Sequence, residues 1–238
     1  MGNFNFPVKW EKFVRVLIDK GGYKDVLEGL ANTAKIAVLG LLIGIVIGTL
    51  IAAVRVMPKY KVLPRVLNAI CSVYVGLFRG TPIVVQLLLG YFVLFPLLGV
   101  DISSVGCCVV IFGLNSGAYV SEIMRSGIQS VDIGQMEAGR ALGLGYVTVM
   151  LKVVIPQAVK NILPTLGNEF ISLIKETSVI NFVGAMDLCN AFKKIGTNSY
   201  EFMIPYIVMG LCYIVIVYAI TLLIKLMERR LRASDRHN

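Results

Sequence analysis

The sequence has 238 residues, of which 57% are hydrophobic and 16% are charged, and its formal net charge is +9. Soluble domains carry about 45–50% apolar and about 25% charged residues, so this composition excludes one ordinary soluble core. It predicts an all-α polytopic membrane protein, and the length leaves room for four to six spans of about 20 residues each. The basic residues are scattered between apolar runs, which argues against nucleic-acid binding.

Residues 1–29 are predicted to form an N-terminal segment that lies flat at the membrane interface. Aromatic and aliphatic residues there could share one side of a helix, while charged residues take the other side. Gly21 and Gly22 are expected to end this helix. The apolar face would consist of Phe4, Phe6, Trp10, Phe13, Val14, Leu17 and Ile18.

The first predicted span covers about residues 30–54 and contains three glycines, Gly40, Gly44 and Gly48, spaced four apart. This spacing allows two helices to approach closely in a membrane. A basic loop without acids follows at 55–65. An apolar stretch at 66–78 is expected to lead into the second span at about 82–100. The residues do not decide whether these two parts form one kinked helix.

The third span is expected at about 103–123, the fourth within 155–183 and the fifth at about 203–226. A polar segment at about 130–156 and a polar loop at 184–200 separate them. Together, residues 30–232 form one predicted transmembrane domain, followed by a short tail at 233–238. The loops at 55–65 and 124–152 and the tail are basic, so the positive-inside rule places them and the C-terminus in the cytoplasm and the N-terminus outside.

The segment that begins Glu137-Ala138-Gly139-Arg140-Ala141-Leu142-Gly143 and continues to Val153, Ile155 and Pro156 resembles the EAA loop of ABC importer permeases. Small side chains at Ala138, Gly139 and Ala141 keep a helix thin enough to enter a cleft on an ATPase. Gly143 allows the chain to turn back, and Glu137 can cap the helix or pair with a basic partner residue. Gly139 stands where this motif usually has another small residue.

Further segments resemble the polar amino-acid subgroup of these permeases over about residues 28–232. The resemblance implies the permease fold of type I ABC importers, two ATPase subunits, a second identical or related permease chain and an extracellular amino-acid-binding protein. ATP and Mg²⁺ would be bound by the ATPase, because this chain contains no phosphate-binding loop. The matching segments are Phe78-Arg79-Gly80-Thr81-Pro82 with Gln86, Leu114 to Tyr119 with Glu122, Gly127 to Ser130, Asn168-Glu169, Lys175 to Ser178 and Glu228 to Arg230.

Ionisable residues within a span are costly and therefore indicate function. Glu169 and Glu176 share a face if their helix is continuous, and polar residues lie near the middle of the third span. These residues are predicted to bind a polar amino acid, with a carboxylate facing an ammonium or a cationic side chain. The predicted substrate site is Asn115, Ser116, Gly117, Glu169 and Glu176.

Alternatives remain for each of these residues. Glu169 could pair with a basic residue of another helix, Glu176 could be solvated beside Lys175, and Asn115 could bond across helices. Glu122 and Arg125, three residues apart, are expected to form a structural ion pair. Two carboxylates would favour a cationic amino acid, while glutamine or cystine could use one of them.

The other functions considered are an ATP-independent secondary carrier or channel, which does not explain residues 137–156, and a membrane enzyme. No H-E-x-x-H or G-x-S-x-G motif occurs, and the only histidine is His237, so no catalytic residue is expected. The five cysteines form no C-x-x-C pair, so a metal site is not expected either. The N-terminus lacks the features of a removable signal peptide.

Overall fold

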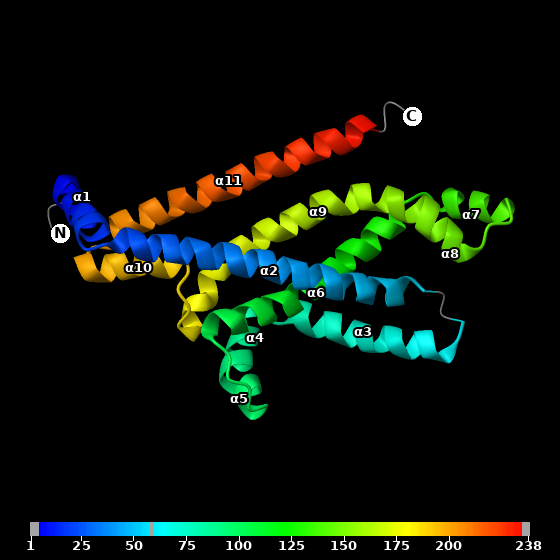
Figure 1. The fold of residues 1–238 in the computed structure, drawn as a ribbon, viewed down its shortest axis with the longest axis horizontal. Helices are drawn as coiled ribbons and strands as arrows, with labels where there is room; N and C mark the ends of the chain where they lie inside the picture. Colours follow the sequence, from blue (N-terminus) through cyan, green and yellow to red (C-terminus); the bar gives the residue numbers. More distant parts are fainter. Residues whose placement is uncertain (1–4, 58–59, 235–238) are drawn as a thin grey trace.

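The computed structural model describes residues 5–57 and 60–234, and side chains up to residue 229. Every regular element in these residues is a helix, as predicted. Five helical segments are long and apolar enough to cross a membrane. The chain begins at one end of the elongated bundle and finishes at the other (Figure 1). Predictions for Phe4, for the loop positions 58–59 and for the tail positions 235–238 lie outside the described residues.

The N-terminal segment contains helix α1 (Phe6–Val14) and the π-helical turn η1 (Arg15–Asp19). Gly21 then takes a left-handed conformation, with φ of 73°, and separates this part from helix α2 (Gly22–Val56). The predicted stop at Gly21 is confirmed, but α2 begins at Gly22 and not near Leu30. Phe13 and Val16 pack against α10 (Leu188–Ser199) and the start of α11 (Met203–Ser234), in a core with Leu188, Phe192, Ile195 and Ile204.

The prediction for the second span was wrong in its position. Helix α3 (Val62–Gly80) has the length and hydropathy of a span, whereas residues 83–97 form a shorter apolar element. Thr81 and Pro82 are extended between them, because a residue before proline avoids the α-helical region. The shorter element, called the α4–α5 arm below, comprises α4 (Ile83–Leu89), η2 (Gly90–Leu94) and α5 (Phe95–Leu97).

Helix α6 (Ser104–Gln129) is the third span and begins at an N-cap in which the Ser103 hydroxyl accepts a hydrogen bond from Gly106. The polar segment after it folds into α7 (Ile133–Ala141), α8 (Tyr146–Val149) and the π-helical turn η3 (Met150–Val154). Helix α9 (Ile155–Glu176) and the 3₁₀ turn η4 (Thr177–Val183) complete the fourth span.

The predicted polar loop at 184–200 is instead helix α10 (Leu188–Ser199), which leads to the last span, α11 (Met203–Ser234). The Asp187 carboxylate caps α10 by accepting hydrogen bonds from the N–H groups of Cys189 and Asn190. Burial raises the pKa of Asp187, although these backbone bonds oppose the rise. The apolar residues of α10 recur at helical spacing and are buried: Leu188, Ala191, Phe192 and Ile195.

The glycine spacing in α2 serves the predicted close helix contact. A Cβ added at Gly40, Gly44 or Gly48 would meet α6 at Phe112, Ser116 or Val120, at distances of 3.3, 2.6 and 2.7 Å. The contact is reciprocal, because Ile43 and Ile47 of α2 lie against glycines 113 and 117 of α6. This tight pair forms the centre of the bundle.

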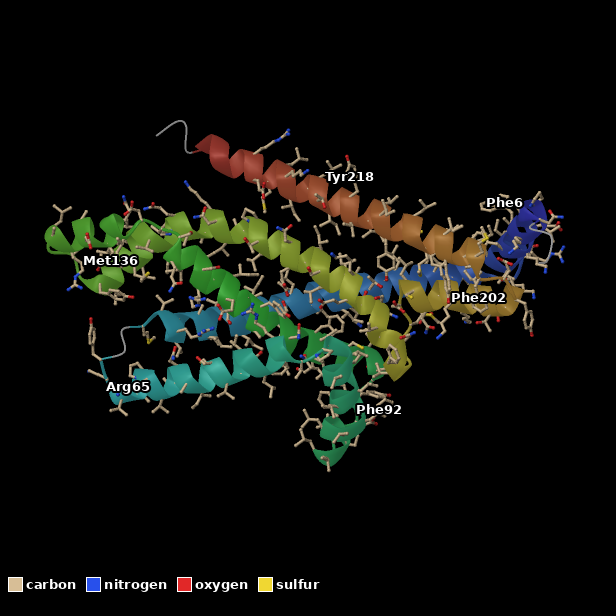
Figure 2. All side chains as sticks on the ribbon, turned by 180° about the vertical axis from the view of Figure 1, so that it is seen from behind. Phe6, Arg65, Phe92, Met136, Phe202 and Tyr218 are labelled. Atoms are coloured by element: carbon tan, nitrogen blue, oxygen red, sulfur yellow. The ribbon has the colours of Figure 1, made fainter. Side chains whose placement is uncertain are left out.

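Two parts leave the bundle (Figure 1). The α4–α5 arm projects crosswise from the end of α3, and Phe92 lies on it well away from the other helices (Figure 2). Helix α11 starts against α10 and diverges from α9 toward the C-terminus. Helices α7 and α8 protrude at the end where α2 and α3 are joined, and α1 and α10 cover the opposite end.

Candidate functional site

A hydrogen bond between Ser116 and Glu169 joins two of the predicted site residues. The Ser116 hydroxyl lies 3.0 Å from Oε1 of Glu169, so α6 and α9 meet here through a carboxylate. Ser116 is fully buried, whereas Glu169 is partly exposed. Ser116 falls near the middle of α6, which places this carboxylate well inside the bundle. No basic partner of Glu169 occurs in the part of the chain that the structure describes.

Asn115 bonds across helices, as one of the alternatives held. Its amide nitrogen donates to Oε1 of Gln86 at 2.9 Å and lies 3.3 Å from the Phe78 carbonyl oxygen. Gln86 in turn donates to the carbonyl oxygens of Phe78 and Thr81, at 2.8 and 3.0 Å, and to the Thr81 hydroxyl. These amides satisfy the backbone where α3 stops, which fixes the junction between α3 and the α4–α5 arm.

Gly117 follows Ser116 directly but is covered by α2 and α3, and Glu176 lies seven residues beyond Glu169. A Cβ at Gly117 would meet Ile47 at 2.8 Å and the Tyr74 hydroxyl at 3.0 Å, so protein atoms cover this glycine. Glu176 is the last residue of α9, which is continuous from Ile155, so Glu169 and Glu176 do share a face. Glu176 is partly exposed, and within the described residues no hydrogen bond or ion pair to its carboxylate occurs.

The predicted ion pair of Glu122 and Arg125 is confirmed and is part of a larger group. Nε and Nη2 of Arg125 lie 3.0 and 2.7 Å from Oε2 of Glu122. Oε1 of the same carboxylate accepts a hydrogen bond from Arg55 of α2. Arg79, in the last turn of α3, approaches Oε1 to 4.0 Å and stands over the Tyr119 ring at 5.3 Å. We call these four residues the Glu122 cluster: Arg55, Arg79, Glu122 and Arg125.

The predicted coupling segment forms a short protruding helix. The Asp132 carboxylate caps α7 by accepting a hydrogen bond from Gly134, and Gly143 ends it with φ of +82°. This left-handed conformation gives the physical reason for a glycine at 143. Glu137, Ala138 and Ala141 are exposed on α7, while Gly139 is buried. A Cβ at Gly139 would meet Val149 at 2.7 Å, so this glycine serves the contact with α8.

An exposed leucine beside α7 escaped the sequence analysis. Leu142 is 81% exposed at the end of the helix, and Ile133, 73% exposed, lies at its start. Large apolar residues at such exposure on a helix that also presents two alanines indicate a protein contact. The signal was available in the sequence, because apolar residues flank the polar α7 on both sides. Met136 marks this helix at the tip of the bundle (Figure 2).

Side-chain bonds tie the coupling segment to the spans. Asn161 of α9 donates to the Ser130 hydroxyl at 2.9 Å, and Gln157 donates to Gln135 at 3.3 Å. The Tyr146 hydroxyl reaches the Val56 carbonyl oxygen at the end of α2. A displacement of α7 therefore has direct contacts through which to reach α9 and α2.

The chain resembles known transport proteins over most of its length. Residues 40–233 match the family described as the binding-protein-dependent transport system inner membrane component. The arginine transport system permease protein ArtQ of Bacillus subtilis is 40% identical over 210 residues, which cover 88% of this chain and 94% of ArtQ. A putative glutamine transport system permease protein, GlnP of Rickettsia bellii, is 38% identical over 209 residues, covering 88% and 94%.

A solved structure supports the same assignment. The crystal structure of an amino acid ABC transporter with histidines contains a chain that is 37% identical, with a TM-score of 0.81. The match covers 90% of this chain and 97% of that chain. Sequence and fold therefore agree along nearly the whole length, which includes α7 and both glutamates of α9.

Proposed function

Because the chain belongs to the binding-protein-dependent transport system inner membrane component family, we propose that it carries a polar amino acid into the cytoplasm as the permease of an ATP-driven uptake system. The family match and the sequence relatives identify it as a multi-pass amino-acid ABC permease. The observation that carries the proposal is the protruding helix α7, with Glu137, Ala138, Ala141 and Leu142 exposed at one end of the bundle. A stand-alone carrier has no need of such a helix.

The proposed partners are those that membership of the family implies, and the protruding α7 supports the first of them. Helix α7 enters a cleft on an ABC ATPase, which binds ATP and Mg²⁺, while this chain performs no catalysis. The end with α7 and the C-terminus then faces the cytoplasm, and the end with α1 and α10 faces outward, where an amino-acid-binding protein delivers substrate. A second permease chain, identical or related, completes the pathway.

The proposed substrate site centres on Ser116 and Glu169, with Asn115 and Gly117 on either side of Ser116 on α6. Within the described residues the Glu169 carboxylate accepts a hydrogen bond from one hydroxyl only, that of Ser116, so it keeps acceptor capacity for an ammonium group. Glu176 lies on the same face about 10 Å nearer the proposed outer end, at 1.5 Å per residue. Two carboxylates at this separation suit a cationic amino acid, such as the arginine named for ArtQ, and Glu169 alone suits glutamine or cystine.

The proposed mechanism is alternating access. ATP binding draws the two ATPases together and moves α7. The bonds from α7 and α8 to α9 and to the end of α2 transmit this motion, so the spans rearrange around the carboxylate of Glu169. Hydrolysis then resets the spans for the next cycle.

The test is co-purification and uptake. The tagged chain is isolated gently from native membranes, and ATPases that accompany it are identified, while cells are assayed for uptake of labelled arginine, glutamine and cystine. Glu137→Arg and Leu142→Asp change the exposed face of α7, and both should lose the ATPase and the uptake. Glu28→Arg makes the same charge change at an exposed position at the opposite end and should keep both.

An ATPase recovered with the wild type and with Glu28→Arg, but not with the α7 variants, would support the proposal. Uptake that continues without any ATPase would overturn it in favour of a secondary carrier, in which the two glutamates of α9 would act as an ion relay.

A further inference from the structure

The N-terminal segment of α1 and η1 packs only part of its apolar face on the bundle. Phe13 and Val16 are 2% and 4% exposed, because they contact α10 and the start of α11. Phe6 and Trp10 of the same apolar face remain 48% and 46% exposed. The structure thus divides this face into a strip that protein covers and a strip of aromatic rings that is left open.

The open strip lies on one flank of α1. Phe6 and Trp10 are four residues apart, so they share a side of the helix, and their rings stack with centroids 6.3 Å apart. Lys12 stands two residues after Trp10, which is about 200° around the helix. The segment therefore presents rings on one flank and charge on the other, as helices at a membrane surface do.

Aromatic rings also gather where the last span begins. Phe202 and Tyr206 have ring centroids 5.7 Å apart and are 43% and 42% exposed, and Tyr200 just before them is 91% exposed. The Lys9–Glu201 ion pair of 3.0 Å joins the two groups of rings, since its members directly precede a ring of each group. We call the exposed rings of both groups the aromatic collar: Phe6, Trp10, Tyr200, Phe202 and Tyr206.

The collar lies at one end of the molecule. Figure 2 shows Phe6 and Phe202 at the same end of the bundle, opposite Met136 of α7. Helix α1 runs across this end, steeply inclined to the spans (Figure 1). A helix that crosses the spans lies along the plane of the bilayer, so its exposed rings meet the bilayer at one depth.

The exposed face of α11 indicates what surrounds the collar. Beyond Tyr206 this face becomes aliphatic, with Ile207, Leu211 and Val215 exposed at intervals of four residues. Helix α11 has the length and hydropathy of a span, so these side chains border lipid hydrocarbon. Aromatic rings that give way to aliphatic residues along one exposed face mark the boundary between headgroups and hydrocarbon.

A bilayer suits the collar better than a protein partner does. The charged neighbours of Trp10 are already used, because Lys9 pairs with Glu201 and Glu11 pairs with Arg15 at 3.0 Å. Few charges beside the rings are therefore left to select a protein. Tryptophan and tyrosine rings combine an apolar body with a polar edge, which the wet, partly apolar interface of a bilayer satisfies without a specific partner.

We propose that the aromatic collar binds the headgroup region of the bilayer at the end opposite α7, so that α1 and η1 form an in-plane membrane anchor for α10. The anchor acts through Phe13 and Val16, which join the segment to α10 while Phe6 and Trp10 enter the lipid. Helix α10 is thereby held beside the headgroups at a fixed depth. Only the assignment of this leaflet to the outer side rests on the proposed function.

The test uses Trp10, the only tryptophan of the chain. The complex of this chain with its ATPase is placed in nanodiscs of phosphatidylcholine that carries bromine, a quencher of tryptophan emission, either near the headgroup end or near the terminus of its acyl chains. The emission of the Trp10→Phe complex is subtracted, which removes the tryptophans of the ATPase. Bromine near the headgroup should quench about half of the Trp10 emission and terminal bromine less than about a fifth, because an interfacial helix is buried only about 5–10 Å deep.

Moving the tryptophan within the Trp10→Phe chain gives matched controls. Lys12→Trp places it on the opposite flank of α1 and should escape quenching. Tyr206→Trp, in the collar, should be quenched like Trp10. Leu211→Trp lies about 7.5 Å further along α11, at about 1.5 Å per residue, and should be quenched more by terminal bromine than Tyr206→Trp is. Thermal unfolding of each variant shows that it is folded.

The charge of the lipid separates the rings from the basic residues of the segment. Replacing part of the phosphatidylcholine by phosphatidylglycerol with the same bromine should leave the quenching of Trp10 within about a fifth of its value, since the rings do not depend on lipid charge. Quenching that requires phosphatidylglycerol would assign the contact to Lys12 and Lys20 and overturn the role of the rings.

Three further results would overturn the anchor. Trp10 left unquenched by both lipids, while Leu211→Trp is quenched, would leave the collar to water or to a protein, such as a binding protein or a second permease chain. Equal quenching of Trp10 and of Lys12→Trp would remove the oriented strip. Stronger quenching of Trp10 by terminal bromine would place α1 within the hydrocarbon.

The measurement needs neither substrate nor ATP. A chain that recovers no ATPase would overturn the proposed function alone, and the same quenching experiment on the chain by itself would still decide the role of the collar.

Discussion

Glu169 and Glu176 differ in their surroundings although they share one face of α9. Glu169 meets Ser116 within the bundle, while Glu176 ends the helix with no such partner in the described chain. We expect Glu169 to bind the α-ammonium group of every substrate and Glu176 to bind only a cationic side chain. Uptake of every amino acid should therefore depend on Glu169, whereas only uptake of cationic amino acids should depend on Glu176.

Neutralising these carboxylates one at a time should therefore give distinct uptake patterns. Glu176→Gln should lower arginine uptake about tenfold or more and leave glutamine uptake within about twofold, because a charge-assisted hydrogen bond contributes about 1.5–3 kcal/mol. Glu169→Gln should lower both. Initial uptake rates at limiting substrate, corrected for the amount of chain in the membrane, provide the measurement. Arginine uptake that is unchanged in Glu176→Gln would remove this residue from the site.

Glu201 joins α1 to the start of α11 at the end of the bundle opposite α7. Its carboxylate lies 3.0 Å from Nζ of Lys9 and also accepts from the N–H of Met203 at the start of α11. The hydrogen bond from Lys9 lowers the pKa of Glu201 below its ordinary value of 4.5, with a smaller contribution from Met203. Since the folded pKa is lowered, the contact stabilises the fold above pH 4.5 and is lost as the pH falls through the folded pKa.

The only tryptophan, Trp10, is adjacent to Lys9 and reports this contact. On acidification from neutral pH to about pH 3, its emission in the purified protein should shift to longer wavelength as α1 separates from α11. In Glu201→Gln the emission should already be shifted at neutral pH, and its further change on acidification should be smaller. Identical titrations of the two proteins would show that the contact does not hold α1 in place.

At the scale of elements, the all-α class, the number of spans and the stop at Gly21 could be predicted from the sequence. Each depends on a local signal: the length and hydropathy of an apolar run, or the backbone freedom of a glycine. The second span was misplaced because Arg65 and Asn68 lower the local hydropathy of α3, while the apolar run after Pro82 is long enough to resemble a span. Helix α10 was missed because its polar residues outnumber the apolar ones. Its periodicity at Leu188, Ala191 and Ile195 was the better guide.

The candidate site was predictable only in part, because contacts between different helices are not encoded in any one local stretch of sequence. A carboxylate, an amide or a hydroxyl in an apolar helix attracts notice in the sequence, and two such residues, Ser116 and Glu169, do meet. Partners depend on how the helices cross, and the sequence does not specify this. The bonds of Asn115 to Gln86 and the approach of Arg79 to Tyr119 could be found only from the structure.

The glycine contact between α2 and α6 gives a prediction for an element. In Gly44→Ala, the new methyl group would lie 2.6 Å from the Ser116 hydroxyl oxygen and 3.1 Å from backbone carbon, so both helices must shift. Overpacking of this kind costs about 1–3 kcal/mol. We expect a lower melting temperature for the purified complex and weaker amino-acid binding, because the Ser116 hydroxyl leaves Glu169.

Gly210 of α11 provides the matched control, since no atom lies within 4 Å of a Cβ placed there. Gly210→Ala should leave the melting temperature unchanged or slightly raised, as alanine favours a helix over glycine. A Gly44→Ala protein that melts like the wild type and binds normally would contradict the close α2–α6 contact.

For the whole molecule, the exposed faces show where a single chain is incomplete. The α4–α5 arm leaves the bundle crosswise (Figures 1 and 2). Lipid can cover apolar side chains, but it cannot pair the guanidinium of Arg79, whose side chain is 44% exposed beside the arm. A second permease chain against the arm would enclose this guanidinium. The exposed apolar residues of the arm are Leu89, Phe92, Val93, Leu94 and Leu97.

Two copies of the chain with different tags, expressed together, should therefore co-purify if the permease pairs with itself. Phe92→Ala combined with Leu94→Ala should reduce recovery of the second tag by about tenfold, since buried apolar anchors at an interface contribute about 2 kcal/mol or more. Ile214→Ala with Leu211→Ala removes comparable side chains from the exposed face of α11, which runs with the bundle and can be covered by lipid. That control should pair normally. Pairing lost in the α11 variant and kept in the arm variant would move the interface to α11.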